Sequence, residues 1–268
     1  YEFILMNFDE PIRVSSIVLT NLKIQWKSDD SREYLLLSGG TINQIRNVLN
    51  ISLSSADAER IKLNRLLVTN ETNSFMSIAF NSLADYNGNY LSSIPTTSAR
   101  VFDFFVADVV HPILKSFDLS MNSGELTLIF SEPVQSDLRT EQIRLQSRFF
   151  AVDGISYTLD LGIVKTSDGI RQIVDLTQAG VNDIKLINSL ARTAASCFLI
   201  AGNTTAQDMS GNSLVSVVDG SALLVNAFLG DVTPPGIITM GLDANAEQLR
   251  VTFDDLMHVI LTDARGAQ

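Results

Sequence analysis

The sequence predicts an all-β chain made of tandem β-sandwiches, with a period of about 123 residues and one short helix in each repeat. Three observations predict this class: the chain matches itself at a fixed shift, most segments alternate between apolar and polar residues, and turn residues separate those segments. Hydrophobic residues make up 46% of the 268 residues, which is enough for a packed core. We therefore expect folded domains rather than a disordered chain.

The internal repeat is the strongest of these signals. At a shift of 123 positions the chain aligns with itself without a gap from residue 53 to residue 130. The matched pairs include 61–63 with 184–186, Phe75 with Phe198, Asp85 with Asp208, Gly88 with Gly211, Asn89 with Asn212, Phe105 with Phe228, Asp108 with Asp231 and Pro112 with Pro235. At a shift of about 122, residues 8–11 also fall on residues 130–133.

The repeat divides the chain into three segments. Residues 1–107 are expected to form a repeat that lacks its first strand, residues 108–230 a complete repeat, and residues 231–268 the first strands of a third. Because both ends fall inside a repeat, we expect the chain to be a segment of a longer array.

The local patterns predict the elements in chain order. Ser54 is a helix N-cap followed by acidic residues, so a short helix is expected from about residue 54, with a counterpart over 179–190. Period-two alternation predicts strands at 21–25, 125–130, 142–146, 223–228 and 248–253, and residues 122–124 read as a hairpin turn. About seven strands in about 120 residues are typical of an immunoglobulin-type (Ig-type) sandwich.

The expected core of the complete repeat consists of apolar residues on these strands. They are Leu126, Leu128, Phe130, Ile143, Leu145, Leu176, Phe198 and Phe228.

Three short motifs recur in a fixed order. Residues 231–235 read Asp-Val-Thr-Pro-Pro, residues 130–134 read Phe-Ser-Glu-Pro-Val, and residues 208–214 read Asp-Met-Ser-Gly-Asn-Ser-Leu. This order resembles the Ig-like repeats of large surface proteins of bacteria and some unicellular eukaryotes. The resemblance implies a place in an adhesin, a bacterial surface protein or a filamentous appendage such as a flagellar hair. The chain departs from the pattern at the first junction, where one Pro is lost, and after Phe253, where Glu-Pro is lost.

One candidate metal site follows from sandwich topology. Asp108, Glu132 and Asp208 would meet at the pole where the complete repeat begins, and calcium prefers several carboxylate oxygens. The favoured alternative is structural: Asp208 and its counterpart Asp85 would hold tight turns by side-chain hydrogen bonds, with Gly211 and Gly88 at positive φ.

Other candidate residues are isolated. Asn70 and Asn203 lie in Asn-x-Thr sequons and are candidate glycosylation sites, whereas a third sequon at Asn50 falls within a strand. Tyr86 and Tyr90 flank the turn at Gly88 and are candidate contacts with neighbouring chains in an assembly. Cys197, the only cysteine, is expected to be a part-buried small apolar residue, with an intermolecular disulfide as the alternative.

The composition narrows the function classes. The net charge of −11 disfavours nucleic-acid binding, which needs basic residues to neutralise phosphates. No run of apolar residues is long enough for a membrane span, and no catalytic motif is present, so we expect a protein that is not an enzyme. The favoured function is an extracellular structural protein that self-associates into a filament or surface appendage. Alternatives are the stalk of a cell-surface adhesin and a carbohydrate-binding module of a secreted enzyme.

Overall fold

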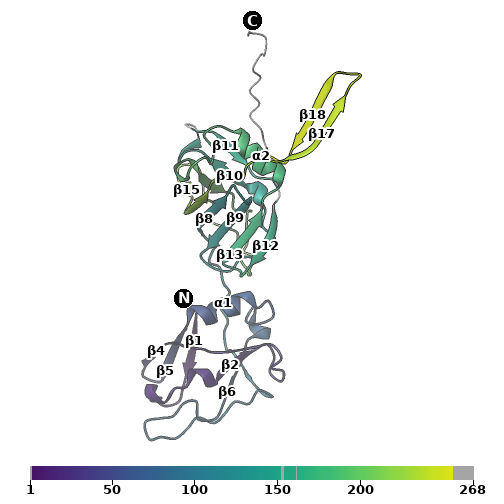
Figure 1. Ribbon diagram of the computed structural model, residues 1–268. Coiled ribbons are helices and arrows are strands. Elements are labelled where there is room, and N and C mark those ends of the chain that lie inside the picture. Colours follow the sequence, from purple (N-terminus) through teal and green to yellow (C-terminus); the bar gives the residue numbers. More distant parts are fainter. Residues whose placement is uncertain (1, 152–153, 161, 256–268) are drawn as a thin grey trace. The chain divides into compact units, whose positions relative to one another are not determined.

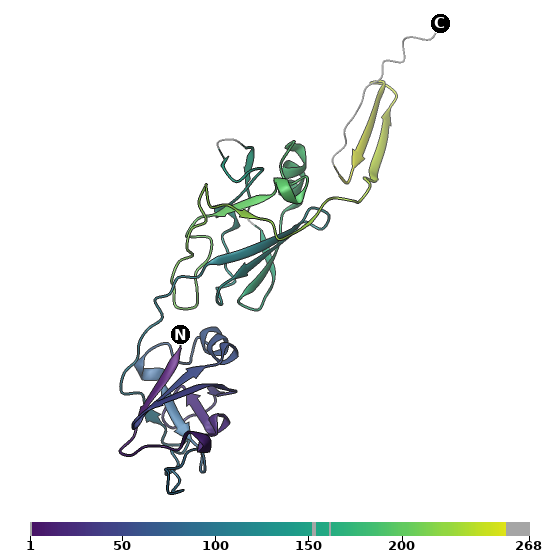
Figure 2. The same ribbon diagram turned by 90° about the vertical axis from the view of Figure 1, so that its left-hand side faces the viewer.

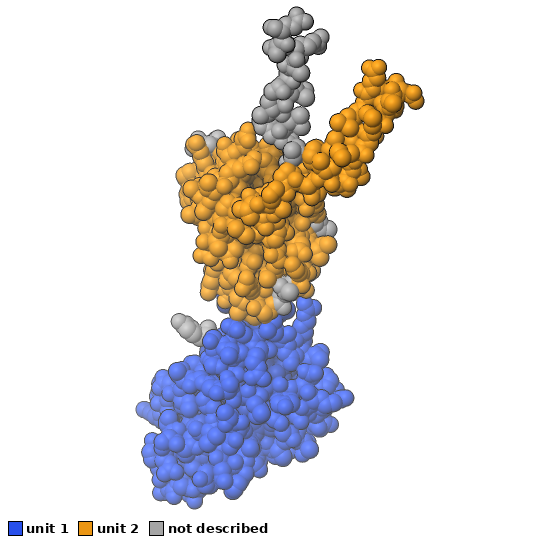
Figure 3. All heavy atoms as spheres, in the orientation of Figure 1, with its two compact units in different colours: residues 1–111, 207–212 blue, residues 112–206, 213–268 orange. Residues whose placement is uncertain are grey.

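The structure is a computed structural model that describes residues 2–151, 154–160 and 162–255 (Figure 1). Within these residues it contains five β-sheets and two α-helices, which agrees with the predicted all-β class. Tertiary contacts divide the chain into two compact units (Figure 3). Unit 1 comprises the residues up to His111 together with residues 207–212, and unit 2 comprises residues 112–206 and the residues from Ser213 onward. The predicted three-segment division rests on the sequence repeat and stays a prediction.

Unit 1 contains two sheets. The first has the strand order β1-β5-β4 and the second β3-β2-β6-β7. Their strands are β1 (Phe3–Asn7), β2 (Leu22–Gln25), β3 (Tyr34–Leu36), β4 (Gly40–Ile45), β5 (Val48–Leu53), β6 (Phe75–Ile78) and β7 (Arg100–Val101). Apolar side chains of both sheets, such as Ile51 on β5 and Ile24 on β2, belong to one buried cluster. This cluster is the core of unit 1.

Unit 2 also contains two sheets around a core, together with a separate hairpin. The sheets have the orders β12-β13-β9-β8-β16 and β11-β10-β14-β15, and β17 pairs only with β18. The strands are β8 (Leu114–Ser120), β9 (Glu125–Phe130), β10 (Ile143–Gln146), β11 (Ser156–Thr158), β12 (Ile163–Ser167), β13 (Arg171–Asp175), β14 (Phe198–Ala201), β15 (Leu223–Leu224), β16 (Ala227–Leu229), β17 (Ile237–Asp243) and β18 (Gln248–Phe253).

Each unit carries one short α-helix with a capped start. Helix α1 (Ser55–Leu63) begins after Ser54, whose hydroxyl accepts a hydrogen bond from the backbone N–H of Asp57 at 3.2 Å. Helix α2 (Gln178–Leu186) begins after Thr177, which caps the N–H of Gly180 at 3.0 Å. The sequence predicted that the second helix would reach residue 190. It ends earlier, and Ser189 lies at φ 74°, which an α-helix does not allow.

Short 3₁₀ helices occupy several connections. They are η1 (Val14–Ser16), η2 (Leu19–Asn21), η3 (Glu71–Asn73), η4 (Thr140–Gln142) and η6 (Ala194–Ser196).

The strands of the two units follow corresponding orders. The sheet β3-β2-β6-β7 has the same order as β11-β10-β14-β15, and β4-β5-β1 has the same order as β12-β13-β9. Strand β6 begins at Phe75 and β14 at Phe198, 123 positions further; β5 begins at Val48 and β13 at Arg171, again 123 positions further. Among the described residues, the three-stranded sheet of unit 1 has no strands that correspond to β8 and β16 of unit 2.

Two details of the predicted strands are wrong. The strand expected over 223–228 is interrupted, because the backbone N–H of Val225 bonds to Cys197 in one sheet and that of Asn226 bonds to Phe117 in the other. The chain crosses between the sheets at this point. Phe198 is not part of the core: Leu199 and Ala201 face inward, so the alternation of β14 turns Phe198 outward, where its ring contacts Phe149.

The other predicted core residues lie in or against the core. Leu126, Leu128, Phe130, Ile143 and Leu145 are buried, and Leu176 and Phe228 pack against them.

Candidate functional site

A lysine in the last turn of α1 binds two carboxylates in unit 1. The ammonium of Lys62 lies 3.0 Å from Glu2 Oε1 and 3.2 Å from Asp108 Oδ2, with 19% of the lysine side chain exposed. A cation is favoured at this end of a helix, where the unpaired carbonyl groups concentrate negative charge. Asp108 also accepts a hydrogen bond from the N–H of Val110 at 3.0 Å. Lys62 therefore holds the start of the connecting segment 108–112 against α1.

Helix α2 also carries a lysine that binds two carboxylates, in unit 2. The ammonium of Lys185 lies 2.8 Å from Asp231 Oδ2 and 2.8 Å from Asp255 Oδ2. The three side chains are only 13%, 27% and 17% exposed. Burial alone would lower the pKa of Lys185, but its hydrogen bonds with both aspartates outweigh burial and raise it. The hydrogen bond from Lys185 lowers the pKa of Asp231.

The lysine and the first aspartate of each cluster occupy matching places in the repeat, whereas the second carboxylates, Glu2 and Asp255, do not. Lys185 lies 123 positions after Lys62, and Asp231 lies 123 positions after Asp108. Asp255 lies 123 positions after Glu132. The strand that ends at Phe253 therefore keeps a carboxylate at the position where the Glu of the Glu-Pro motif is lost. Sequence reasoning missed the lysines, although both lie in the matched runs 61–63 and 184–186. The repeat alignment was the signal that could have found them.

Asp208 and Asp85 hold equivalent turns. Asp208 accepts hydrogen bonds from the backbone N–H of Asn212 at 2.7 Å and from its Nδ2 at 2.8 Å, while Asp85 accepts the same two bonds from Asn89 at 2.7 Å each. Both carboxylates are buried. The hydrogen bond from the Asn89 side chain is the main cause of the lowered pKa of Asp85.

The glycines of these turns have left-handed backbones, with φ 91° at Gly88 and 90° at Gly211. This geometry agrees with the turn interpretation of the two aspartates.

The predicted calcium ligands are divided between the two units. Asp108 and Asp208 both belong to unit 1, where their carboxylate oxygens lie within 4.8 Å of each other. Asn212 connects them, because its Nδ2 donates to the carbonyl of Asp108 at 3.0 Å as well as to Asp208. Glu132 is buried and belongs to unit 2. The three-carboxylate calcium site therefore stays a prediction.

Asp108 and Asp208 could bind a metal cation only in competition with Lys62. The lysine ammonium already neutralises Asp108, and both oxygens of Asp208 already accept N–H bonds. A calcium ion at this pair would have to displace the lysine and take over part of these bonds.

Exposed aromatic rings gather near the turn at Gly88. Tyr86 is 67% exposed and Tyr90 is 52% exposed, as their predicted contact role requires. Phe80, which sequence reasoning missed, is 65% exposed, and its ring centroid lies 5.9 Å from that of Tyr90. Together these three side chains form the aromatic patch of unit 1.

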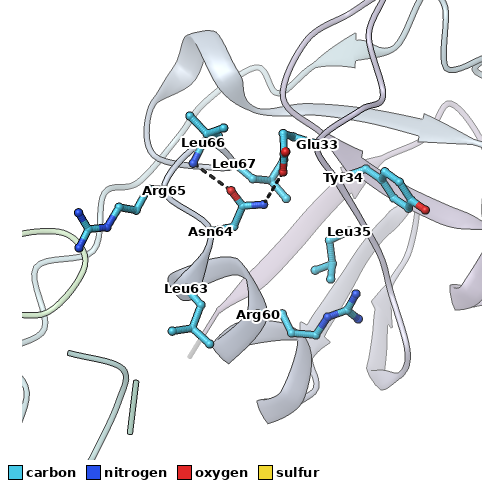
Figure 4. Close-up of a pocket in the computed structure, with 9 residues that line it drawn as sticks. All are labelled: Glu33, Tyr34, Leu35, Arg60, Leu63, Asn64, Arg65, Leu66 and Leu67. Carbon is cyan, nitrogen blue, oxygen red and sulfur yellow. Dashed lines mark hydrogen bonds between the residues drawn. The ribbon is translucent and has the colours of Figure 1, made fainter. Parts of the chain in front are cut away.

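A pocket of about 560 Å³ lies beside the end of α1 in unit 1 (Figure 4). It is lined by Glu33, Tyr34, Leu35, Arg60 and residues 63–67. Glu33 accepts a hydrogen bond from Asn64 Nδ2 at 3.2 Å. Glu33 is the only carboxylate among the lining residues, whereas glycoside hydrolysis needs two. The pocket lining offers no nucleophile with a base beside it.

The remaining candidates are placed as single residues. Asn70 and Asn203 are exposed, and Asn50 is partly buried in β5. Cys197 is buried and unbridged, and burial raises the pKa of its thiol to about 12. The thiol is more deeply buried than the part-buried residue expected from the sequence, and its burial disfavours a disulfide between chains.

Comparison with protein-family models and with curated proteins found no match for this chain. In the part of the chain that the structure describes, neither α-helix is long and apolar enough to cross a membrane.

Proposed function

We propose that this chain is a segment of an extracellular structural protein, built of tandem Ig-like sandwiches with a period of about 123 residues, that self-associates into a filament or surface appendage. The observation that carries the proposal is the recurrence of one architecture. Equivalent strands of the two units follow the same order at offsets of 121 to 123 residues, and each unit has a lysine in the last turn of its helix that is bound to an aspartate of the following segment. An array of such repeats is extended along one direction, which suits a structural role.

The lysine contacts give this array a mechanical role. A segment between two domains is flexible unless side chains hold it. Lys62 holds Asp108, and Lys185 holds Asp231, in both cases at the first residue of the connecting segment. Anchoring this residue shortens the free length of each connection. We infer that the anchored connections make the array stiff enough to act as a filament wall or a spacer.

A filament is favoured over an adhesin stalk by the surface of unit 1. Exposed aromatic rings on an isolated stalk would stay in water, whereas a filament subunit buries such rings against its neighbours. The aromatic patch of unit 1 has three such rings, and only 18% of the chain is charged. The adhesin stalk remains the alternative. The carbohydrate-binding module is the weaker alternative, and the pocket beside α1 is the place that would serve it.

The location is tested by labelling the cells that make the protein. Antibodies against the chain should bind intact cells as strongly as permeabilised cells. Mass spectrometry of the native protein should find glycans at Asn70 and Asn203 if it is secreted by a eukaryote. Labelling that requires permeabilisation would contradict the proposal.

The assembly role is tested by removing the aromatic rings. The double variant Tyr86→Ser and Tyr90→Ser should fold normally, because both rings are exposed, and should lose self-association in light scattering. Tyr34→Ser is the matched control, since Tyr34 is 47% exposed but belongs to β3, outside the patch. Equal loss of association in the control would refute the role of the patch.

A further inference from the structure

Strand β4 lies at an open edge of the sheet β1-β5-β4 in unit 1. Within the described ranges it pairs with β5 and with no other strand. Figure 1 labels the strand, and Figure 2 shows the same sheet turned by 90°. Along an antiparallel edge strand, the backbone N–H and C=O groups of successive residues point in turn toward the neighbouring strand and toward the open side.

The pairing of β5 with β1 shows which groups of β4 stay open. Asn47, just before β5, accepts a hydrogen bond from the N–H of Phe8 on the β1 side. Because the bonds alternate along β5, Val48 and every second residue after it bond to β4 instead. Their partners are Ile45, Asn43 and Thr41. The N–H and C=O groups of Ile42 and Gln44 therefore point toward the open edge.

The side chains of the β4–β5 hairpin leave this edge unprotected. Strands β4 and β5 contain no charged residue and no proline. Thr41, Asn43 and Ile45 form the exposed face of β4, whereas Ile42 packs against the core of unit 1. A regular, uncharged edge strand of six residues is a template for pairing with another strand.

The equivalent edge of unit 2 is protected. Strand β12 begins 123 positions after β4 and also lies at the end of its sheet order. A register shift after Val164 interrupts its pairing with β13. Lys165, at the place of Ile42, carries a charge at the same point. A bulge and a lysine are devices that keep an edge strand from pairing with another chain, and β4 has neither.

Further strands of the repeat would not cover the edge of β4. In unit 2, β8 and β16 lie beyond β9, and β9 occupies the place that β1 has in unit 1. Among the described residues, β12 stays at the opposite end of that sheet. A strand added beside β1 at the place of β8 would therefore leave β4 open.

We propose that β4 of one copy of this chain pairs antiparallel with β4 of a second copy, so that the two sheets become one. A two-fold axis at Asn43 brings Ile42 of each copy opposite Gln44 of the other, which satisfies the open groups of both residues. The two strands are then paired from Thr41 to Ile45. This inference rests on the proposed self-association and names one of its surfaces.

Charge and symmetry favour a second copy as the partner. Each copy has a net charge of −11, so two copies approach most easily where both surfaces are uncharged. Asn43 faces its own counterpart at the axis, and its amide can both donate and accept, so the two side chains complement each other. Thr41 faces Ile45 of the second copy, and β-branched side chains pair well across strands. Main-chain hydrogen bonds supply the affinity of such strand addition.

The β4 contact differs in kind from the aromatic patch of unit 1, with which it shares no residue. A two-fold contact closes on itself and joins chains in pairs, so a filament needs a second contact in order to continue. The β4 pair and the aromatic patch supply these two contacts.

An engineered disulfide tests the register in the full chain. Two facing residues that share no backbone bonds have Cα atoms about 4.5 Å apart, within the span of a disulfide. Asn43→Cys should therefore form disulfide-linked dimers under mild oxidation. Thr41→Cys is the matched control, because its two thiols lie four residues apart in the same register, about 13 Å. Both positions are exposed, and Cys197 is buried.

Dimers of the Asn43 variant without dimers of the control are the expected result. Equal cross-linking of the two variants would overturn the proposal. Cross-linking of neither variant, or of the control alone, would overturn it too.

Exchanged charges test the same axis without a covalent bond. Asn43→Lys and Asn43→Asp each place two like charges opposite each other, so each variant alone should lose the dimer in sedimentation experiments. An equimolar mixture places opposite charges there and should dimerise more than either variant alone. Thr41→Lys with Thr41→Asp is the control pair. These charges do not face each other, so their mixture should lie between the two single variants.

A mixture of the Asn43 variants that also lies between its components would contradict pairing at this axis. If the Asn43 variants keep the full association in light scattering that Tyr86→Ser with Tyr90→Ser loses, the β4 contact is wrong and the proposed filament stands. A chain that associates through neither surface would contradict both.

Discussion

Replacing Lys185 with Met tests how firmly α2 holds the segment that follows unit 2. The variant removes the ammonium that lies against Asp231 and Asp255 while keeping most of the apolar stem of the side chain. Breaking a fully buried pair costs about 3–5 kcal/mol, and breaking an exposed pair costs about 0.2–1 kcal/mol. The three side chains are between 13% and 27% exposed, so we expect about 1–2 kcal/mol.

The measurement is hydrogen exchange at the amides of Val232 and Thr233. The N–H of Val232 bonds to Asn122 Oδ1 at 3.2 Å, across to the β8–β9 turn, and we expect this bond to open more often when the segment is released; the N–H of Thr233 bonds within the segment, to Asp231 Oδ1 at 3.1 Å. A loss of about 1–2 kcal/mol raises their exchange about 5- to 30-fold. Lys165→Met is the matched control, because Lys165 also binds a carboxylate at 2.8 Å but is 53% exposed. Unchanged exchange in the Lys185 variant, or an equal change in the control, would refute the anchoring role.

The pH dependence of the same exchange has a defined sign. The pKa of Asp231 is lowered from its ordinary value of 3.8, so its contribution is complete above that pH and is lost as the pH falls through the lower folded-state value. The pKa of Lys185 is raised from 10.5, so its contribution is complete below that pH and is lost as the pH rises through the higher folded-state value. The protection of these amides against hydrogen exchange should therefore be constant between about pH 4 and pH 10 and should fall outside this window.

Three further predictions concern single sites. Asp208→Ala removes the acceptor of three hydrogen bonds in its turn and should cost about 2 kcal/mol in urea unfolding, and a loss below about 0.5 kcal/mol would contradict the turn role. The Cys197 thiol, buried with its pKa raised to about 12, should react with iodoacetamide only as fast as the chain unfolds; rapid labelling of the folded protein would show that the thiol is accessible. If Asp108, Glu132 and Asp208 form the predicted calcium site, calcium should raise the thermal unfolding midpoint, and the rise should be larger in Lys62→Met, where no ammonium competes for Asp108, and absent in Glu132→Gln. A midpoint that ignores calcium in all three proteins would exclude the metal site.

The sequence was sufficient to predict features that depend on local chemistry. The N-cap at Ser54 and the alternation over 125–130 and 248–253 each produced the expected element. The inward place of Cys197 followed from the usual behaviour of a free cysteine as a small apolar residue. These features need only neighbouring residues, so a single sequence contains the information.

Features that depend on distant partners were missed or misplaced. Phe198 is apolar and begins a strand, but only the pairing of β14 with its neighbours decides which face turns inward. Residues 223–228 alternate like one strand, yet the chain changes sheets at Asn226, whose N–H bonds to Phe117. Because Phe117 lies far away in sequence, the local pattern does not reveal this change.

The lysine anchors were missed for a similar reason. A lysine on a helix usually lies in solvent, and its mostly buried position at Lys185 depends on aspartates that follow 46 and 70 residues later. The repetition of Lys62 and Lys185 is visible in the sequence, but the sequence does not show which carboxylates the fold brings to them.

The most direct test of the proposed array is an electron-microscope image of the native particle, with antibodies against this chain as the label. A filament or appendage built of these sandwiches should be labelled along its whole length, at intervals that repeat with the domains. Label confined to single short stalks on the cell surface would favour the adhesin instead. Label on compact particles with no extended form would contradict the array.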